Sequence, residues 1–272
     1  MYKLIAIDLD GTLLNNNKEI SQRNMQAIAL AKNKGVRVIV CSGRVYMGAR
    51  LFAKQLELTD PIIACNGAKI SQNKDGKELF AQHICKEACL EIIDLCHKHN
   101  VYYHIYADDI MLSEKMEFAT LKYYERNKQL MPEDRVEIEI VADMKRKILT
   151  MQQNVLKFVI ISQNDDVLAK IRREAHLISQ VDVMSSNYDN FEIVDKGVSK
   201  GEALKFLSKE LGIAPEEMIA IGDNENDISM LKYAGLGIAM DNGEQCAKDI
   251  AQYITATNEE DGVALAIEKF IL

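Results

Sequence analysis

The sequence has no CxxC pair, although six of its 272 residues are cysteines. The cysteines are scattered, and several lie inside apolar runs such as VIVC and IIAC. This distribution indicates buried thiols in a reducing compartment. A zinc site is the less favoured alternative, because structural zinc ligands usually come in close pairs.

Long apolar runs and a basic leader are also lacking. No uncharged apolar stretch approaches the roughly 18–20 residues that a membrane-spanning helix needs. The first ten residues, MYKLIAIDLD, contain no basic region followed by a long apolar stretch and a small-residue cleavage site. We therefore expect a cytoplasmic protein without a membrane partner.

An excess of positive charge is missing as well. The chain has 33 Lys and Arg against 41 Asp and Glu, which gives a net charge of −8. Nucleic-acid-binding surfaces are normally basic, so no nucleic-acid partner is expected. The P-loop patterns GxxxxGKS and GxxxxGKT are absent, which argues against nucleotide binding of that type. An acidic protein that handles anionic substrates has to gather positive charge locally.

What the sequence does contain is an alternation of apolar strands and helices. Residues 3–8 (KLIAID) and the segment VRVIVC are rich in β-formers, and they flank a helix predicted from Ser21 to Gly35. A further helix to about Leu56 leads to a third strand in PIIACNGA. This alternation predicts an α/β fold, with a Rossmann-like parallel sheet and helices on both faces.

The regular alternation of strands and helices ends after the third strand. Residues 68–80 have the pattern of a hairpin. From about 84 to 190 we expect a helix, a strand (VYYHIY), a helical region, a strand (LKFVIIS), a helix and a short strand (VDVMSS). FEIVD then resumes the core, followed by the helix SKGEALKFLSKELG and the strands MIAIGD, GLGIAM and YITAT. We therefore predict a core at 1–83 and 190–272, interrupted by an inserted α/β domain at 84–189.

Four polar motifs follow predicted strands, where helices are expected to begin. In open α/β sheets, ligands bind at the carboxyl ends of the strands. In chain order the motifs are Asp8-Leu9-Asp10-Gly11-Thr12, Ser42-Gly43-Arg44, Ser199-Lys200-Gly201 and the run from Gly222 to Asp227 (GDNEND).

The first and last of these motifs bring carboxylates together. Asp8 and Asp10 repel each other unless a cation or a proton is shared between them. The acidic residues of GDNEND are hard oxygen donors suited to Mg²⁺, and they lack the spacing of an EF-hand. Taken singly, the first motif also fits an ordinary Asx turn, and the last also fits a capped loop with solvated acids.

The two middle motifs offer groups that bind anions. A hydroxyl and backbone N–H groups at a helix start form a phosphate cradle, which Ser42 and Gly43 provide. Lys200 in the first turn of a helix is mildly disfavoured by the macrodipole, so it invites a compensating anion such as phosphate or Asp8. Taken singly, Ser42 also fits a helix N-cap and Lys200 a plain surface lysine.

Together and in this order, the motifs resemble those of the haloacid dehalogenase superfamily of phosphotransferases. DLDGT, CSGR, SKG and GDNEND span the chain, and the insert between the second and third resembles the second type of cap domain, C2. NGA after the third strand and EIVDKGVSKGEAL are similar to the Cof-type, sugar-phosphatase-like branch. Cys41 departs from the Thr or Ala that often precedes the serine, and we expect no functional consequence.

The resemblance implies a Mg²⁺-dependent phosphohydrolase that forms an aspartyl-phosphate intermediate on Asp8. It also implies that Asp10 protonates the leaving oxygen and later activates water, a role that ester hydrolysis requires. Lys200 would bridge Asp8 and the phosphate. The implied phosphate-binding residues are Leu9, Ser42, Gly43, Lys200 and Asn226. The implied metal ligands are Asp8, the main-chain carbonyl of Asp10 and Asp223, with Thr12 and Asp227 supporting them.

Substrate choice is expected to depend on the insert. Tyr102, His104 and Tyr106 alternate along one predicted strand and would share a face, with Asp108 and Asp109 following them. This face is either a surface that contacts substrate or ordinary cross-strand packing.

We therefore expect a phosphatase for a small phosphorylated metabolite. A sugar phosphate is the leading class, with pyridoxal phosphate and flavin mononucleotide as alternatives that the resemblance allows. The rival functions are a phosphomutase with the same Asp8 and Asp10, and a non-catalytic module that binds a phosphorylated ligand. The sequence gives no indication of the oligomeric state.

Overall fold

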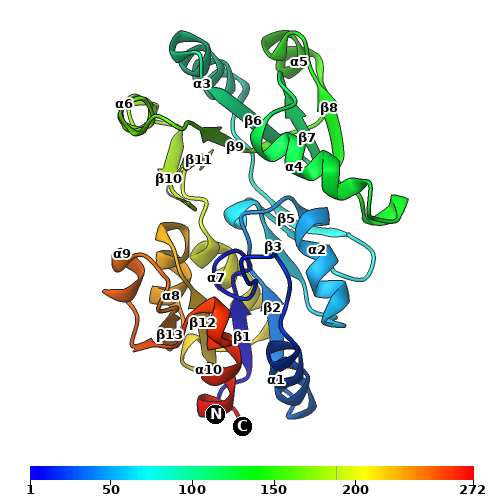
Figure 1. Ribbon diagram of the computed structural model, residues 1–272, viewed down its shortest axis with the longest axis vertical. Coiled ribbons are helices and arrows are strands. Elements are labelled where there is room, and N and C mark those ends of the chain that lie inside the picture. Colours follow the sequence, from blue (N-terminus) through cyan, green and yellow to red (C-terminus); the bar gives the residue numbers. More distant parts are fainter. Residues whose placement is uncertain (188) are drawn as a thin grey trace.

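The computed structural model describes residues 1–187 and 189–272, and its lower half in Figure 1 is built on a parallel sheet. The strand order is β14-β13-β12-β1-β2, and all neighbouring pairs run parallel. Strands from the two ends of the chain therefore share one sheet, as the predicted interruption of the core requires. The strands are β1 (Leu4–Ile7), β2 (Arg37–Val40), β12 (Met218–Gly222), β13 (Leu236–Ala239) and β14 (Tyr253–Ile254).

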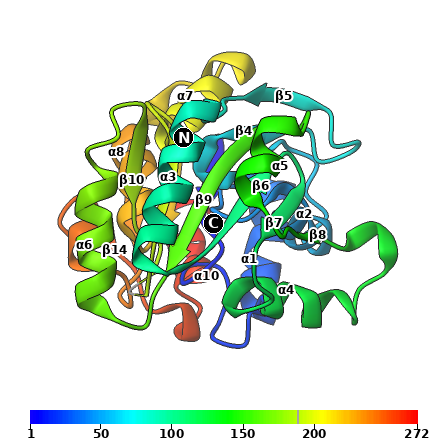
Figure 2. The same ribbon diagram turned by 90° about the horizontal axis from the view of Figure 1, so that it is seen from above.

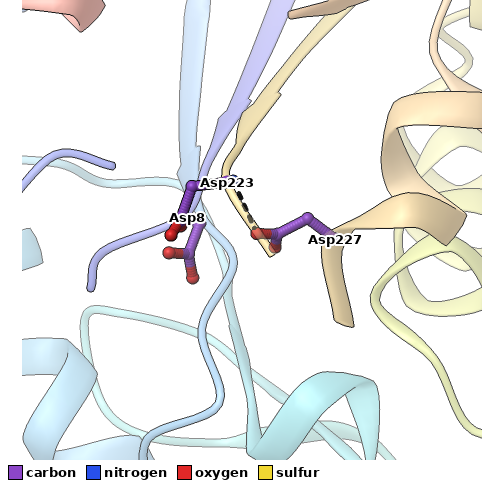
Figure 3. Close-up of side chains that lie close together, drawn as sticks. All are labelled: Asp8, Asp223 and Asp227. Atoms are coloured by element: carbon purple, nitrogen blue, oxygen red, sulfur yellow. Dashed lines mark hydrogen bonds between the residues drawn. The ribbon is translucent and has the colours of Figure 1, made fainter. Parts of the chain in front are cut away.

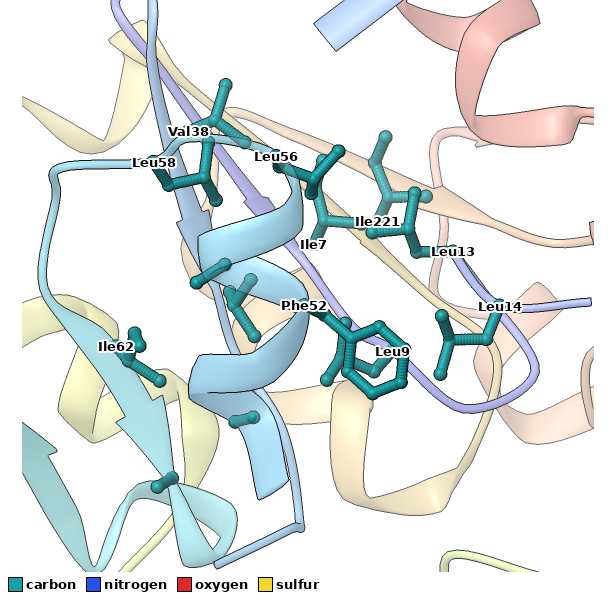
Figure 4. Packing of buried hydrophobic residues seen from close by; sticks show 14 of the residues in the cluster. Ile7, Leu9, Leu13, Leu14, Val38, Phe52, Leu56, Leu58, Ile62 and Ile221 are labelled. Atoms are coloured by element: carbon teal, nitrogen blue, oxygen red, sulfur yellow. The ribbon is translucent and has the colours of Figure 1, made fainter. Parts of the chain in front are cut away.

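Helices cover both faces of this sheet, because successive apolar residues of its strands point in opposite directions. Ile5 and Ile7 of β1 pack into one apolar layer with α1, α2 and α10, and Leu4 and Ala6 pack into the other with α7 and α8. Figure 4 shows Phe52 of α2 in the first layer, near Leu9. The helices are α1 (Gln22–Asn33), α2 (Tyr46–Gln55), α7 (Lys200–Leu211), α8 (Ile228–Tyr233), α9 (Gln245–Lys248) and α10 (Gly262–Phe270).

The predicted helix limits are confirmed where the sequence provides capping residues. The Ser21 side chain accepts a hydrogen bond from the N–H of Asn24 at the start of α1. The Ser199 side chain does the same for Glu202 in α7, and Gly212 ends that helix in the left-handed conformation. Lys200 therefore lies in the first turn of α7.

A small antiparallel sheet connects the two halves of the molecule. β4 (Lys69–Ser71) and β5 (Glu78–Ala81) form the hairpin predicted at 68–80, and β4 also pairs with β3 (Ile62–Ala64). A single bridge between Cys41 and Ile63 places this sheet beside the parallel one. The third predicted strand thus extends the core through a bridge alone.

The upper half of Figure 1 contains a six-stranded sheet with the order β10-β11-β9-β6-β7-β8. Neighbouring strands run antiparallel except for the parallel pair β7–β8. Its strands are β6 (Tyr102–Ala107), β7 (Ile110–Ser113), β8 (Glu137–Ile140), β9 (Val155–Ile161), β10 (Val181–Met184) and β11 (Asn190–Asp195). Its helices are α3 (Lys86–His99), α4 (Phe118–Asn127), α5 (Met144–Thr150) and α6 (Asp165–Ala175).

The two faces of the six-stranded sheet differ in what covers them. Tyr103 and Ile105 of β6 and Phe158 of β9 pack with α3, α5 and α6 in one apolar cluster. Figure 2 looks onto this helical layer, with α3 and α5 lying over the strands. The alternate residues of β6 and β9 point the other way, toward the parallel-sheet half, and α4 lies on that side beside α2 (Figure 1).

Two sequence predictions about this region were wrong. The region predicted as helical after VYYHIY also contains β7 and β8, which extend the sheet beyond β6 and place β8 at its edge. The strand FEIVD, assigned to the core from residue 190 onward, is β11 and pairs with β9 and β10 instead. A buried apolar strand carries no local signal for which of two sheets it joins, so long-range pairing decided the assignment.

The remaining regular structure consists of short 3-10 turns, several of which cap strands or helices. They are η1 (Cys65–Gly67), η2 (Pro132–Asp134), η3 (Pro215–Glu217), η4 (Glu225–Asp227) and η5 (Asn258–Glu260). Within the described parts of the chain, no helix combines the length and the apolar character that crossing a bilayer demands.

Candidate active site

A cavity of about 670 Å³ lies between the carboxyl ends of β1 and β2 and the uncovered face of the six-stranded sheet. Its floor includes residues of the first two motifs, and its roof comes from alternate residues of three central strands. The floor residues are Asp8, Asp10, Ser42, Gly43 and Arg44, and the roof residues are His104, Tyr106, Lys157, Val159, Ile161, Asn190 and Glu192.

Lys200 joins two of the sequence motifs at the floor of this cavity. Its Nζ donates hydrogen bonds to Asp8 Oδ1 and to Asp227 Oδ1, both at 2.6 Å. The Lys200 side chain is fully buried. Burial lowers the pKa of Lys200. The adjacent Asp227 and Asp8 carboxylates outweigh this effect and raise the pKa well above its ordinary value. Lys200 is therefore a fixed cation beside Asp8.

Three carboxylates converge at this point, one from the first motif and two from the last. Oxygen atoms of Asp8, Asp223 and Asp227 all lie within 4.8 Å of one another, and Figure 3 shows the three side chains gathered there. Burial raises the pKa of Asp8 to about 7, Lys200 opposes this rise and Asp227 adds to it. Burial and the charges of Asp227 and Asp8 raise the pKa of Asp223 well above its ordinary value. One lysine does not compensate this group of acids.

The hydrogen bonds distinguish the roles of these carboxylates. Asp227 Oδ2 accepts from the N–H groups of Asp223 and Asn224 at 2.9 and 3.0 Å, while its Oδ1 holds Lys200. Thr12 Oγ1 donates to Asp223 Oδ1 at 2.9 Å. In the described residues, no hydrogen bond uses Oδ2 of Asp8 or Oδ2 of Asp223. These two oxygens fit a divalent cation such as Mg²⁺, which prefers carboxylate oxygen.

Gly11 allows the first and last motifs to approach each other. Its φ is +83°, and a Cβ at this position would lie 2.3 Å from Asp223 Oδ2. Any side chain would therefore displace the Asp223 carboxylate.

The Asp10 side chain lies outside the carboxylate group and is held by two cations. Arg44 donates from Nε and Nη2 to the two carboxylate oxygens at 2.7 and 2.8 Å, and Lys18 Nζ donates to Oδ1 at 2.9 Å. Burial raises the pKa of Asp10, but the charges and hydrogen bonds of Arg44 and Lys18 outweigh it and hold this pKa well below its usual range. A metal contact from Asp10 can come only from its main chain in this arrangement.

The second motif is tied to the six-stranded sheet. Ser42 is buried, and its Oγ accepts a hydrogen bond from the N–H of Arg44 at 3.2 Å. The Gly43 carbonyl accepts a hydrogen bond from Lys157 Nζ on β9. A Cβ on Gly43 would lie 2.8 Å from Asn66 Oδ1 and 3.3 Å from Lys157 Nζ, so any side chain there would displace these two groups.

Asn226 enters the same network from the last motif. Its Nδ2 donates to Asn66 Oδ1 at 3.1 Å, and Asn66 in turn donates to Glu192 on β11. The sequence placed NGA after the third strand and assigned Asn66 no role. Leu9 differs from the other predicted phosphate contacts, because its side chain is buried in the apolar core and only its main chain is available to phosphate.

The predicted polar–aromatic strand is only partly a cavity wall. His104 and Tyr106 line the cavity. Tyr102 shares their face, but its hydroxyl lies 2.6 Å from Thr120 Oγ1 and its ring packs on Phe118. Asp109 pairs with Lys69 of β4 at 2.9 Å. Tyr102 is therefore used in packing, whereas His104 and Tyr106 face the cavity, and their contact with substrate stays a prediction.

Sequence reasoning missed the basic residues that surround the cavity. Arg44 lies in the second motif, but no role was predicted for it from the sequence. Lys18 and Lys157 were not identified as candidates. Helix α4 also lines the cavity, through Ala119, Lys122, Tyr123 and Arg126. Their spacing of three, four and seven residues marks one helix face and was the available signal.

Comparisons with known proteins agree with this geometry. A family model described as haloacid dehalogenase-like hydrolase matches residues 5–267. The 5-amino-6-(5-phospho-D-ribitylamino)uracil phosphatase YcsE of Bacillus subtilis (strain 168) is 34% identical over 274 residues, which cover 99% of this chain and 96% of that protein. The pyridoxal phosphate phosphatase YbhA of Escherichia coli (strain K12) is 29% identical, with 99% of both chains covered.

A solved structure shows the same fold along the whole chain. The haloacid dehalogenase-like hydrolase from B. subtilis superposes with a TM-score of 0.87 at 28% identity, covering 99% of this chain and 100% of that one. The matched region includes all four motifs and the insert. This chain therefore belongs to the haloacid dehalogenase superfamily, as a Cof-type hydrolase of the phosphatase kind.

Proposed function

We propose that this phosphatase hydrolyses phosphate monoesters of small metabolites, with Asp8 as the nucleophile and Mg²⁺ as the cofactor. The observation that carries the proposal is the position of Asp8. Its carboxylate lies 2.6 Å from the buried Lys200 amino group and beside Asp223, at the floor of the cavity. A nucleophile that attacks a phosphate dianion needs positive charge beside it, which Lys200 supplies and a bound Mg²⁺ would increase.

The metal would bind to Asp8, Asp223 and the main-chain carbonyl of Asp10. Mg²⁺, when bound, offsets the negative charge of the carboxylates and of the phosphate oxygens. Asp227 supports this site by holding Lys200 and the two N–H groups of the turn after β12. Thr12 supports it by fixing one oxygen of Asp223.

Each step of the reaction uses a different side chain of this site. The Asp8 carboxylate forms a bond to phosphorus while the bond to the leaving oxygen breaks, and Lys200 neutralises the charge that develops. Asp10 gives a proton to the leaving oxygen and then takes one from the water that releases phosphate. The Arg44 and Lys18 contacts keep Asp10 ionised without substrate, so we infer that Asp10 separates from them and takes up a proton from solvent before it protonates the leaving oxygen.

We also propose that the core carries out catalysis and that the inserted unit selects the substrate. Residues 84–189 were predicted as the inserted domain, and we propose that this unit continues to about Asp195, because β11 pairs with β9. This unit covers the cavity and would select the substrate, for which a phosphorylated sugar is the leading class. The substrates in the names of YcsE and YbhA, a phosphoribitylamino pyrimidine and pyridoxal phosphate, are the alternatives.

Phosphate release from a panel of sugar phosphates, pyridoxal phosphate and flavin mononucleotide tests the proposal. We expect release that requires Mg²⁺ and falls to background in Asp8→Asn. Wild-type protein that releases no phosphate from any compound, with or without Mg²⁺, would contradict the proposal. Conversion of a hexose phosphate into its isomer without release would identify a phosphomutase instead.

A further inference from the structure

Some of the basic residues that line the cavity form ion pairs with acidic residues, and others do not. Among its basic residues, Lys18 and Arg44 are paired with Asp10, and Lys157 is paired with Glu192. The other two, Lys122 and Arg126, form no ion pair with any described residue. Two acids of the lining remain: Asp8 is paired with Lys200, and Glu19 is exposed on the loop that carries Lys18.

Lys122 and Arg126 lie on the same face of α4. They are four residues apart, so their side chains project one turn apart along the helix. Ala119 and Tyr123 occupy the same face and line the same cavity. The helix therefore presents two unpaired cations to the cavity, in a chain whose net charge is −8.

Arg126 is partly buried against another cation. Its guanidinium lies 4.9 Å from the ring centre of Phe52, and the Arg44 guanidinium lies 4.9 Å from the same ring. Burial and the charge of Arg44 both lower the pKa of Arg126 from its ordinary value. Asp10, a carboxylate whose charge acts on Arg126, is already bonded to Arg44. An arginine in such a position is suited to a planar or tetrahedral anion, which it binds with two parallel hydrogen bonds.

His104 supplies a second, independent observation in the same cavity. Its side chain is 1% exposed, and neither Nδ1 nor Nε2 has a hydrogen-bond partner among the described residues. Buried polar atoms without partners are rare and costly in folded proteins. Burial, with the charge of Lys157, lowers the pKa of His104 to about 3, so the ring is neutral and offers one donor and one acceptor.

We propose that the leaving group of the substrate carries a second anionic group, a carboxylate or a second phosphate, which binds to Arg126 and Lys122, and a hydroxyl that binds to His104. This proposal rests on the proposed phosphatase function. Lys200, with Mg²⁺ when it is bound, would neutralise the transferred phosphoryl group, so the charge of α4 is left for another part of the substrate. Phosphorylated sugar acids and sugar bisphosphates have this chemistry.

Two matched pairs of compounds test the second anionic group and distinguish its two sources. 3-Phosphoglycerate differs from glycerol 3-phosphate by a carboxylate, and fructose 1,6-bisphosphate differs from fructose 6-phosphate by a phosphate. For each compound we would measure kcat/KM for phosphate release with Mg²⁺. For a compound that binds without being hydrolysed, we would measure its inhibition constant in an assay of p-nitrophenyl phosphate hydrolysis.

We expect at least one anionic member to bind about tenfold more tightly, or to react with a kcat/KM about tenfold higher, than its partner. Arg126→Met should abolish most of this preference through KM, whereas the exposed Arg173→Met on α6 should leave it unchanged. His104→Leu should raise KM for both members of the preferred pair, because both retain the hydroxyl.

The outcomes separate this proposal from the function on which it rests. No Mg²⁺-dependent phosphate release from any compound, p-nitrophenyl phosphate included, would contradict the phosphatase mechanism itself. Release from p-nitrophenyl phosphate with equal values within both pairs would overturn the second anionic group alone. A preference that survives Arg126→Met and Lys122→Met would overturn the assignment to α4.

Discussion

Lys157 of β9 and Glu192 of β11 form an ion pair with an N–O distance of 2.6 Å, and both side chains are almost fully buried. The same lysine donates to the Gly43 carbonyl, and the same glutamate accepts from Asn66. The pair therefore lies within the six-stranded sheet, while its remaining hydrogen bonds reach Gly43 after β2 and Asn66 after β3. This network holds the roof of the cavity over the second motif.

Removal of one partner of this pair should destabilise the protein strongly. We expect Lys157→Met to lower the free energy of unfolding by about 3–5 kcal/mol, because Glu192 is left as a buried, uncompensated charge. Lys157→Met combined with Glu192→Leu should recover much of that loss, as measured by urea unfolding. Lys98→Met, which breaks the exposed pair with Glu174, is the control and should cost less than about 1 kcal/mol. A double variant no more stable than the single one would contradict the account.

Lys200→Met should abolish most of the phosphatase activity. The substitution leaves Asp8 and Asp227 without their shared cation, so we expect kcat to fall by about 10²-fold or more. Lys205→Met changes an exposed lysine of the same helix, paired with Glu202, and should leave kcat within about twofold. Steady-state phosphate release measures both. A Lys200→Met enzyme with near-normal kcat would show that this cation is not needed at the nucleophile.

Asp10→Asn should affect substrates according to their leaving groups. An alkyl phosphate expels a strongly basic alkoxide that has to be protonated, whereas p-nitrophenolate leaves without help. We therefore expect a fall of about 10²-fold or more in the rate of enzyme phosphorylation by a sugar phosphate, and a much smaller fall with p-nitrophenyl phosphate. Rapid-quench measurement of the first turnover provides both rates. Equal losses for both substrates would argue against Asp10 as the general acid.

His104 should make the stability of the protein dependent on pH. Its pKa is lowered from 6.5 to about 3 by burial and by Lys157. Below pH 6.5 the unfolded chain binds a proton at His104 that the folded chain does not bind. The stability that depends on a neutral His104 is therefore complete above pH 6.5 and is lost as the pH falls toward 3. Relative to His104→Leu, wild-type protein should lose about 2 kcal/mol between pH 7 and pH 5. Unfolding curves of the two proteins that stay parallel over this range would contradict the prediction.

The sequence contained most of the information for the core and for the floor of the cavity. Ser21, Ser199 and Gly212 limit helices through local capping, which a single chain displays directly. Asp8, Lys200 and Asp223 each follow or begin a recognisable element, and the parallel arrangement of the strands brings their ends together. Local signals and the order of the motifs were sufficient for this part.

The roof of the cavity depends on pairings that no local signal specifies. β11 has the composition of a core strand, but its partners are β9 and β10. Arg44 and Asp10 are 34 residues apart, and Lys157 and Glu192 are 35 residues apart. Each ion pair joins residues in or just after two neighbouring strands of one sheet, β1 and β2 or β9 and β11, and this pairing of distant segments follows from the folding of the whole chain. The sequence accordingly predicted the nucleophile and left the surroundings of the leaving group open.

The central claim is that phosphate passes through a covalent bond to Asp8, and trapping this intermediate tests it most directly. Asp10→Asn enzyme should accept phosphate from p-nitrophenyl phosphate but release it slowly, because no base activates the water. Mass spectrometry after acid quench should then show a gain of about 80 Da, one phosphoryl group, on the peptide that contains Asp8, and no gain when Asp8→Asn is also present. A phosphoryl group on another residue would contradict the mechanism. So would an Asp8→Asn enzyme that hydrolyses substrate as fast as the wild type.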